Sequence, residues 1–144
     1  MSTTCLKELA ESIRSVAAVA ARLPDGSAAA RQARETAVCP VQYMRWAEFE
    51  AALRGWRLPP ESRVLDVGSP QWFTLGLARL RPDVKFDYVN IDPDEVHPYA
   101  AIAAAAELAN VRHGVGDARA LSFADATFDA VLSLSVVEHV APSE

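Results

Sequence analysis

The sequence predicts an α/β domain built on a doubly wound parallel sheet, preceded by N-terminal helices. Residues 64–67, 86–91, 111–115 and 128–134 are short segments rich in Val, Leu and Ile, a composition typical of strands buried on both faces. Helix-length connections between such strands favour parallel pairing with right-handed crossovers. The chain has 144 residues, and a domain takes about 100 to 200, so we expect one sheet domain.

Composition and charge favour a small-molecule partner. Hydrophobic residues make up 51% of the chain and charged residues 23%, as in ordinary globular proteins. The net charge is −5, and Lys and Arg do not form the clusters that binding to nucleic-acid phosphates requires. We therefore expect no nucleic acid as a partner.

The cysteines and the apolar segments indicate a cytoplasmic protein without a metal site. Cys5 and Cys39 lack the spacing of a zinc site or of a disulfide framework, and we expect reduced thiols. Lys7 and Glu8 interrupt any signal-peptide core. No uninterrupted apolar run approaches the about 18 residues of a membrane span, so no membrane association is expected.

The first 40 residues are predicted to form a helical extension and a connector. A helix over residues 5–23 is indicated by apolar residues three and four positions apart, which are Leu6, Leu9, Ile13, Val16, Ala20 and Leu23. The stripe would dock onto the protein's own surface or pair with another chain, and we favour the first. We expect residues 27–40 to form the connector and residues 41–144 to form the sheet domain.

A second helix is predicted over residues 41–55, before the sheet begins. Trp46, Phe49, Leu53 and Trp56 recur at helical spacing, and we expect them in the core. Two prolines at 59 and 60 end this segment. Beyond it the prediction alternates strand 64–67, helix 70–80, strand 86–91, helix 98–109, strand 111–115 and strand 128–134.

Polar residues follow each predicted strand at its carboxyl end, where open α/β sheets bind ligands. Four stretches there, "VLDVGS", "YVNID", "GDARALSFADATFDAV" and "SLSVVEHV", resemble in order and spacing the motifs of class I S-adenosylmethionine-dependent methyltransferases. The resemblance covers about residues 41 to 140. The segment "FADATFDAVLSLSVVEHV" is similar to the small-molecule branch of that family. The resemblance implies a Rossmann-like fold and methyl transfer from S-adenosylmethionine to a small-molecule acceptor.

The first motif implies two cofactor-binding residues. Gly68 would let the backbone approach the methionine portion of the cofactor, because a Cβ there would collide with it. Asp66 would orient the loop and the amino group of the cofactor. A purely structural hydrogen bond is an equally good interpretation of Asp66.

The second and third motifs imply two acids that accept hydrogen bonds from the cofactor. Asp92 lies 24 residues beyond Gly68, and its two oxygens would accept from both ribose hydroxyls. Asp94 and Glu95 are expected to cap the next segment. Asp117 would accept from the adenine amino group, with the backbone of Ala118 donating to the ring. An Asx turn is the alternative role of Asp117.

The last motif places Glu138 and His139 near the point of methyl delivery. His139 could act as a general base on an acceptor hydroxyl, because histidine titrates near neutral pH. Its alternative role is to begin the next helix or to line the cleft. The sulfonium is a strong leaving group, so alignment of the reactants does most of the catalysis.

Pro70 and Trp72 replace two glycines that the family's loop usually carries. We expect Ser69 to be the N-cap and Pro70 the first residue of the next helix. Pro70 lacks an N–H and Trp72 adds bulk, which disfavours a pyrophosphate more than a cofactor without phosphate. The alternatives to a methyltransferase are thus an inactive methyltransferase-like binding module and, ranked below it, an NAD(P)-binding oxidoreductase domain.

The resemblance also implies that the chain is truncated after its fourth strand. Family members continue with further strands in the sheet order 3-2-1-4-5-7-6, and only 3-2-1-4 is expected here. Val131, Leu132 and Leu134 would then belong to a sheet edge. An apolar edge invites pairing with another chain, so we expect self-association there.

Overall fold

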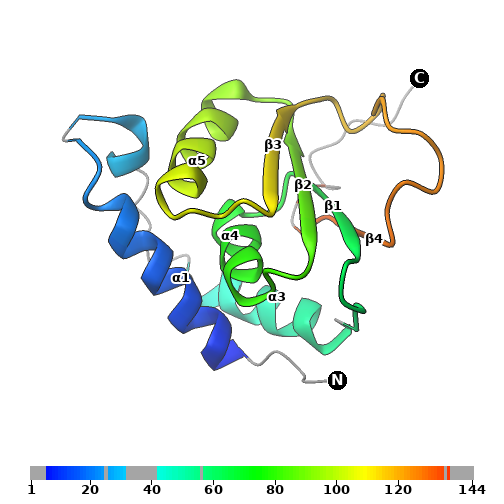
Figure 1. Ribbon diagram of the computed structural model, residues 1–144, viewed down its shortest axis with the longest axis horizontal. Helices are drawn as coiled ribbons and strands as arrows, with labels where there is room; N and C mark the ends of the chain where they lie inside the picture. The colour runs from blue at the N-terminus through cyan, green and yellow to red at the C-terminus, as the bar shows by residue number, and fades with distance from the viewer. Residues whose placement is uncertain (1–5, 25, 32–41, 56, 135, 137–144) are drawn as a thin grey trace.

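The computed structural model describes residues 6–24, 26–31, 42–55, 57–134 and 136 (Figure 1). Its four described strands are β1 (Arg63–Val67), β2 (Lys85–Asn90), β3 (Val111–Val115) and β4 (Ala130–Leu132). All pairs are parallel, in the order β3-β2-β1-β4. The predicted α/β fold and its 3-2-1-4 strand order are confirmed. Cys5, Cys39, Trp56, Glu138 and His139 lie outside the described residues.

β4 is shorter than the predicted strand over residues 128–134. Before it, Phe128 packs edge-on against Phe123, with ring centroids 4.9 Å apart, and under the guanidinium of Arg63. After it, the N–H of Leu134 donates to the Ser69 hydroxyl, 2.9 Å away, in place of a strand partner. The strand ends early because β1 itself turns away at Gly68, which leaves no ladder to extend.

The two crossover helices are α4 (Gln71–Leu80) and α5 (Pro93–Ala105). The prediction for α4 was close, but the predicted range 98–109 for α5 is wrong at both ends. α5 begins earlier because the Asp92 carboxylate accepts the N–H of Asp94 at 2.9 Å and Pro93 occupies the first turn. It ends earlier because Glu107 has a φ of 57°, which a helix cannot continue.

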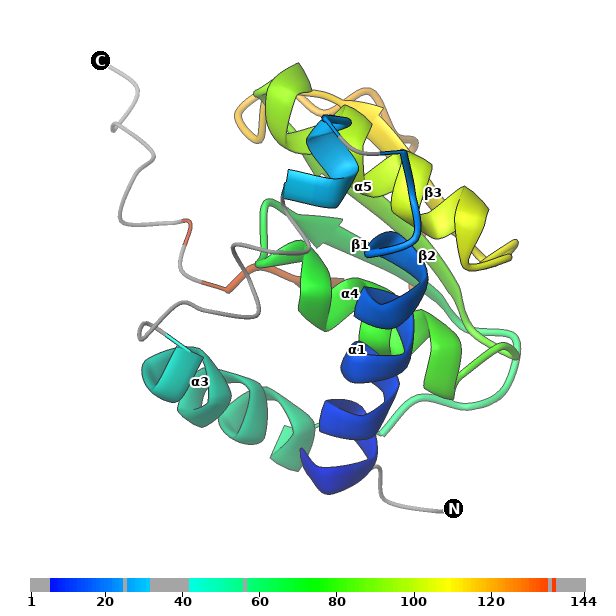
Figure 2. The ribbon, with the colours of Figure 1, turned by 90° about the vertical axis from the view of Figure 1, so that its left-hand side faces the viewer.

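The described helices lie on one side of the sheet, as Figures 1 and 2 show. β1 to β2 and β2 to β3 step in the same direction, so right-handed crossovers place α4 and α5 on the same face. The connection from β3 to β4 steps back across the sheet and therefore passes the other face. That connection, residues 116–129, has no described helix. The strand order thus reverses at β1, between β2 and β4.

α1 (Leu6–Ala20) packs against α4 and α5 on the outside of the helical layer. The expected docking onto the protein's own surface is confirmed, since Leu9, Ile13, Val16 and Ala20 are buried. A Cβ on Gly76 of α4 would lie 2.6 Å from the Ile13 side chain, which shows how closely the two helices approach.

α3 (Gln42–Gly55) joins the same core through its aromatic residues. The ring centroids of Phe49 and Phe73 lie 4.6 Å apart, and Trp46 packs edge-on against Phe49. The expected core role of these aromatics is confirmed. The predicted domain boundary at residue 40 falls among residues that are not described, and it stays a prediction. None of the described helices has the length and hydropathy needed to cross a bilayer.

Candidate functional site

The turn after β1 depends on a glycine at position 68. Gly68 has a φ of +70°, a backbone conformation that disfavours residues with a Cβ. Its N–H donates to the carbonyl of Val89 at 2.8 Å. A Cβ here would lie 3.1 Å from the Cγ2 atom of Val136. Both the backbone angle and the close packing therefore require glycine.

The start of α4 differs from the prediction. Pro70, not Ser69, is the N-cap, and no side chain caps the helix; the carbonyl of Pro70 accepts the N–H of Phe73 at 2.9 Å. The predicted N-cap role of Ser69 is wrong because its hydroxyl is already engaged by the N–H of Leu134. Ser69 instead links the turn to β4.

Asp66 is fully buried beneath the turn. Its Oδ1 accepts the N–H of Ser69 at 3.1 Å, and its Oδ2 accepts the hydroxyl of Thr74. Burial raises the pKa of Asp66 from its ordinary value of 3.8 to about 6, although these hydrogen bonds favour the ionised form. The carboxylate thus orients the loop, while its contact with a cofactor stays a prediction.

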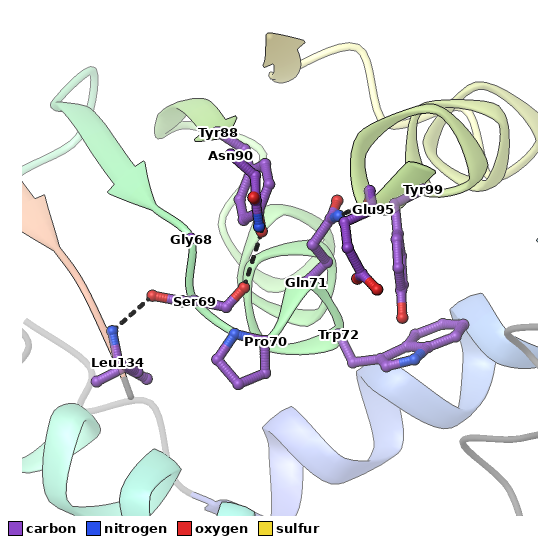
Figure 3. Close-up of a pocket in the computed structure, with 10 residues that line it drawn as sticks. All are labelled: Gly68, Ser69, Pro70, Gln71, Trp72, Tyr88, Asn90, Glu95, Tyr99 and Leu134. Atoms are coloured by element: carbon purple, nitrogen blue, oxygen red, sulfur yellow. Dashed lines mark hydrogen bonds between the residues drawn. The ribbon is translucent and has the colours of Figure 1, made fainter. Parts of the chain in front are cut away.

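A pocket of about 180 Å³ opens beside this turn (Figure 3). It is lined by Gly68, Ser69, Pro70, Gln71, Trp72, Tyr88, Asn90, Glu95, Tyr99 and Leu134. The pocket lies where the strand order reverses, the usual ligand position in open α/β sheets. Small-molecule sites usually measure about 300–1,000 Å³, so this pocket has room for only part of a cofactor.

Trp72 adds less bulk to the open side of the turn than the sequence suggested. Its side chain is 7% exposed and belongs to the hydrophobic core. Its ring packs edge-on against Tyr99, with centroids 5.5 Å apart, so the indole forms the inner wall of the pocket. Most of the Trp72 side chain therefore lies in the core and does not crowd the open side of the turn, contrary to what the sequence had led us to expect.

The loops that follow β1 and β3 are each hydrogen-bonded to β2. The N–H of Gly68 donates to Val89 in β2, and the N–H of Gly116 donates to the carbonyl of Asn90 at 2.9 Å. Asp92 and Asp117 follow these bonded positions within two residues. The sheet thus brings Gly68, Asp92 and Asp117 to one edge, although neither acid lines the pocket at Gly68.

Asp92 is exposed at the start of α5 and is itself the N-cap. The predicted capping by Asp94 and Glu95 is therefore wrong, because these residues lie in the first turn and Asp94 supplies the donor. Oδ1 of Asp92 accepts that N–H at 2.9 Å, and Oδ2 has no partner within the described part of the chain. One oxygen of this exposed carboxylate therefore stays available as an acceptor.

Asp117 forms a local ion pair with Arg119. The guanidinium meets both carboxylate oxygens, with Nη2 2.6 Å from Oδ2 and Nε 3.0 Å from Oδ1. The backbone N–H of Arg119 also donates to Oδ1 at 2.9 Å, so the Asx turn considered for Asp117 is present. These bonds hold the pKa of Asp117 at about 2, below its ordinary 3.8. Ala118, between them, is exposed.

Sequence reasoning missed several of the pocket residues. Tyr88 donates its hydroxyl to the carbonyl of Ser69 at 3.1 Å, and Asn90 donates to the Tyr88 hydroxyl at 3.3 Å. Burial raises the pKa of Tyr88, so the phenol stays protonated. Both residues lie in "YVNID". They are two positions apart on a strand, and this spacing alone could have shown that their side chains share one face of β2.

Comparison with known proteins agrees with the fold and the motifs. A family model described as a methyltransferase domain matches residues 65–144. The YcgJ protein from Bacillus subtilis is similar in structure, with a TM-score of 0.54 and 25% identity over 60% of this chain and 37% of its own length. A SAM-dependent methyltransferase from Aquifex aeolicus has a TM-score of 0.55 and 18% identity, over 69% of this chain and 53% of its own.

No curated protein matches the sequence. The chain spans less than two thirds of either solved structure, 37% of the first and 53% of the second. The family match covers more than half of the chain and includes the turn at Gly68 and both strand-end acids. The chain therefore belongs to the methyltransferase-domain family.

Proposed function

We propose that the protein transfers the methyl group of S-adenosylmethionine to a small-molecule acceptor, with this chain supplying the cofactor-binding half. One observation carries the proposal. At the carboxyl ends of the strands, the loop at Gly68 and the loop at Gly116 are both hydrogen-bonded to β2. Asp92 and Asp117 follow on the same edge. An extended cofactor with a methionine, a ribose and an adenine portion would contact these three loops in turn.

Each portion of the cofactor has a proposed partner. Gly68 would face the methionine portion, with Asp66 holding the loop from beneath. The open Oδ2 of Asp92 would accept from the ribose. Asp117 would accept from the adenine amino group, and the backbone of Ala118 would donate to the ring. The bound cofactor supplies an activated methyl group, and the protein's part is alignment.

His139 is proposed as a general base for acceptors that must lose a proton. The role depends on its position just after β4 in the sequence. A His139→Ala variant that keeps full turnover at saturating substrate and cofactor would exclude it.

The loop at Pro70 supports a cofactor without phosphate. Pro70 is the N-cap of α4 and has no N–H to offer, whereas a pyrophosphate needs free donors at this helix end. S-adenosylmethionine makes no such demand. We therefore expect S-adenosylhomocysteine, the demethylated product, to bind more tightly than NADH.

Asp92→Asn tests the proposed cofactor site without disturbing the fold. Asparagine caps helices as well as aspartate does, so α5 should keep its start. Losing the charge and one acceptor should weaken S-adenosylhomocysteine binding about tenfold in calorimetry. Asp94→Asn, with the same charge change in the same turn, should bind within about twofold of the unchanged protein. Equal effects of the two variants would count against the ribose role.

An inactive binding module is the second candidate function. The small pocket beside Gly68 and the engagement of Asp117 by Arg119 favour it. Transfer of a labelled methyl group to any of a panel of small acceptors would decide for the enzyme. Cofactor binding without transfer by the complete protein, across hydroxyl, amine and carbon acceptors, would favour the module.

We also propose a cytoplasmic location, no nucleic-acid partner and self-association through β4. The side chain of Val131 is 67% exposed on β4, whereas Leu132 faces the helices and is 9% exposed. Exposed apolar residues on an edge strand favour pairing with another chain. A single monomeric species in sedimentation across a range of concentrations would contradict the self-association.

A further inference from the structure

Ser69 holds the turn after β1 through all of its polar groups. Its N–H donates to Asp66 in β1 at 3.1 Å, its carbonyl accepts the hydroxyl of Tyr88 in β2 at 3.1 Å, and its hydroxyl accepts the N–H of Leu134 at 2.9 Å. The residue is 1% exposed. These three hydrogen bonds, here named the Ser69 clasp, join one loop residue to three strands or their ends.

The hydrogen bond to the Ser69 hydroxyl differs from the other two in reaching the end of β4. Both Ser69 and Leu134 line the pocket, so this bond sets the distance between two of its walls (Figure 3). Ser133 donates its hydroxyl to the carbonyl of Val67 at 3.1 Å, and the Val136 side chain packs over Gly68. The end of β4 is therefore attached to the cofactor loop by side chains rather than by strand pairing.

We propose that Ser69 is a positioning residue for cofactor binding, because its hydroxyl fixes the end of β4 against the Gly68 turn and its carbonyl fixes the same turn to Tyr88 of β2. The inference rests on the proposed function. A loop that leaves this arrangement part of the time binds with an affinity lowered by the competent fraction. Ser69 would thus influence the cofactor through the shape of the turn, whether or not it touches the cofactor.

Ser62 provides a matched control at the opposite end of β1. It is 5% exposed, and its hydroxyl donates to the carbonyl of Pro59 at 2.8 Å. Each serine thus lies beside β1, is buried and has its hydroxyl bonded to a backbone group, and Ser69 is additionally bonded through its side chain to Asp66. Only Ser69 lies at the pocket.

The test compares Ser69→Ala with Ser62→Ala by calorimetric titration with S-adenosylhomocysteine. Both variants should lose thermal stability, and Ser69→Ala should lose more, because its side chain also bonds the buried Asp66 carboxylate; the comparison therefore rests on ligand affinity, measured where both variants are folded. Ser69→Ala should bind the ligand about tenfold more weakly, because an N–H of the pocket wall loses its acceptor. Ser62→Ala should stay within about twofold of the unchanged protein. Equal affinities of the two variants would overturn the inference.

Tyr88→Phe provides a second route if Ser69→Ala does not fold. It keeps the ring of a residue that is 2% exposed and removes the donor to the Ser69 carbonyl. We expect binding weakened by about three- to tenfold. Unchanged binding by Tyr88→Phe would overturn the inference for the clasp.

The unchanged protein separates the two proposals. If it binds S-adenosylhomocysteine and the serine variants behave alike, only the role of Ser69 fails. If the unchanged protein does not bind the ligand at all, the proposed function fails, and the inference that depends on it fails too.

Discussion

The loops that follow β1 and β3 both carry proposed cofactor residues, but they are held in opposite ways. At the end of β1 and in the loop that follows, Asp66 and Ser69 are almost fully buried and are bonded to β2, α4 and the end of β4. In the second loop, the side chains of Asp117 and Arg119 are 32% and 56% exposed and are bonded to each other. The polar side chains after β1 are thus held by the surrounding fold, whereas those after β3 are held by each other.

This difference predicts how each loop responds to change. Buried polar groups depend on their partners, and losing one costs much of the desolvation penalty. Exposed ion pairs contribute little to stability because water screens them. Changes after β1 should therefore alter stability and binding together, whereas changes after β3 should leave stability unaffected.

The largest expected effect concerns Asp66 and pH. Its pKa is about 6 in the folded protein and 3.8 ordinarily, so the folded state holds the proton more tightly. Stability from this group therefore falls as pH rises from about 4 to about 6, by about 3 kcal/mol in total, and the loss stays complete above that range. Asp66→Asn should remove this dependence, because asparagine can still accept from Ser69 and can donate to Thr74.

Thermal denaturation between about pH 4 and pH 8 checks this prediction. The quantity to compare is the difference in stability between the unchanged protein and Asp66→Asn at each pH. Asp125→Asn, which removes an exposed carboxylate from the connection before β4, should keep the pH dependence of the unchanged protein. A difference curve that stays flat for Asp66→Asn would show that the carboxylate titrates near its ordinary value.

A smaller effect is expected from Gly68→Ala. The φ of +70° and the Cβ contact of 3.1 Å with Val136 should destabilise the fold by about 1–3 kcal/mol and weaken cofactor binding. Gly26→Ala is the matched control, because Gly26 has a φ of +87° with nothing within 4 Å of a Cβ. It should lose stability from backbone strain alone and bind S-adenosylhomocysteine unchanged. Equal binding losses would remove the special role of the β1 turn.

The smallest effect is expected from Arg119→Ala. The pKa of Asp117 is about 2 because of Arg119, so any stability from the pair is present above pH 3.8 and is lost as pH falls through about 2. Removing Arg119 should raise that pKa toward its ordinary value and leave the melting temperature at neutral pH unchanged. NMR titration of Asp117 and a melt of the same sample measure both quantities.

A substantial loss of stability in Arg119→Ala would break the comparison, because it would show that the β3 loop also depends on tertiary contacts. Arg112→Ala is the control on β3 itself. Arg112 is exposed one residue into the strand, and its removal should leave the pKa of Asp117 near 2.

The strands and the edge that carries the acids could be predicted because they follow from local patterns. Runs of Val, Leu and Ile mark strands, and parallel pairing brings their carboxyl ends together. The start of α5 was missed although its signal is local, because Asp92 followed by Pro93 is the pattern of an N-cap with proline in the first turn. The end of β4 depended on a partner, Ser69, that is distant in sequence.

The sequence by itself determined the strands, the family motifs and the position of a glycine after the first strand, since each is visible in residues close together in the chain. Only the tertiary structure decided how Ser69 is used and how strongly Asp66 holds its proton. A hydroxyl bonds whichever donor the fold places nearest, and a carboxylate's pKa depends on how much water the surrounding core excludes. Neither quantity is encoded in the residues next to it.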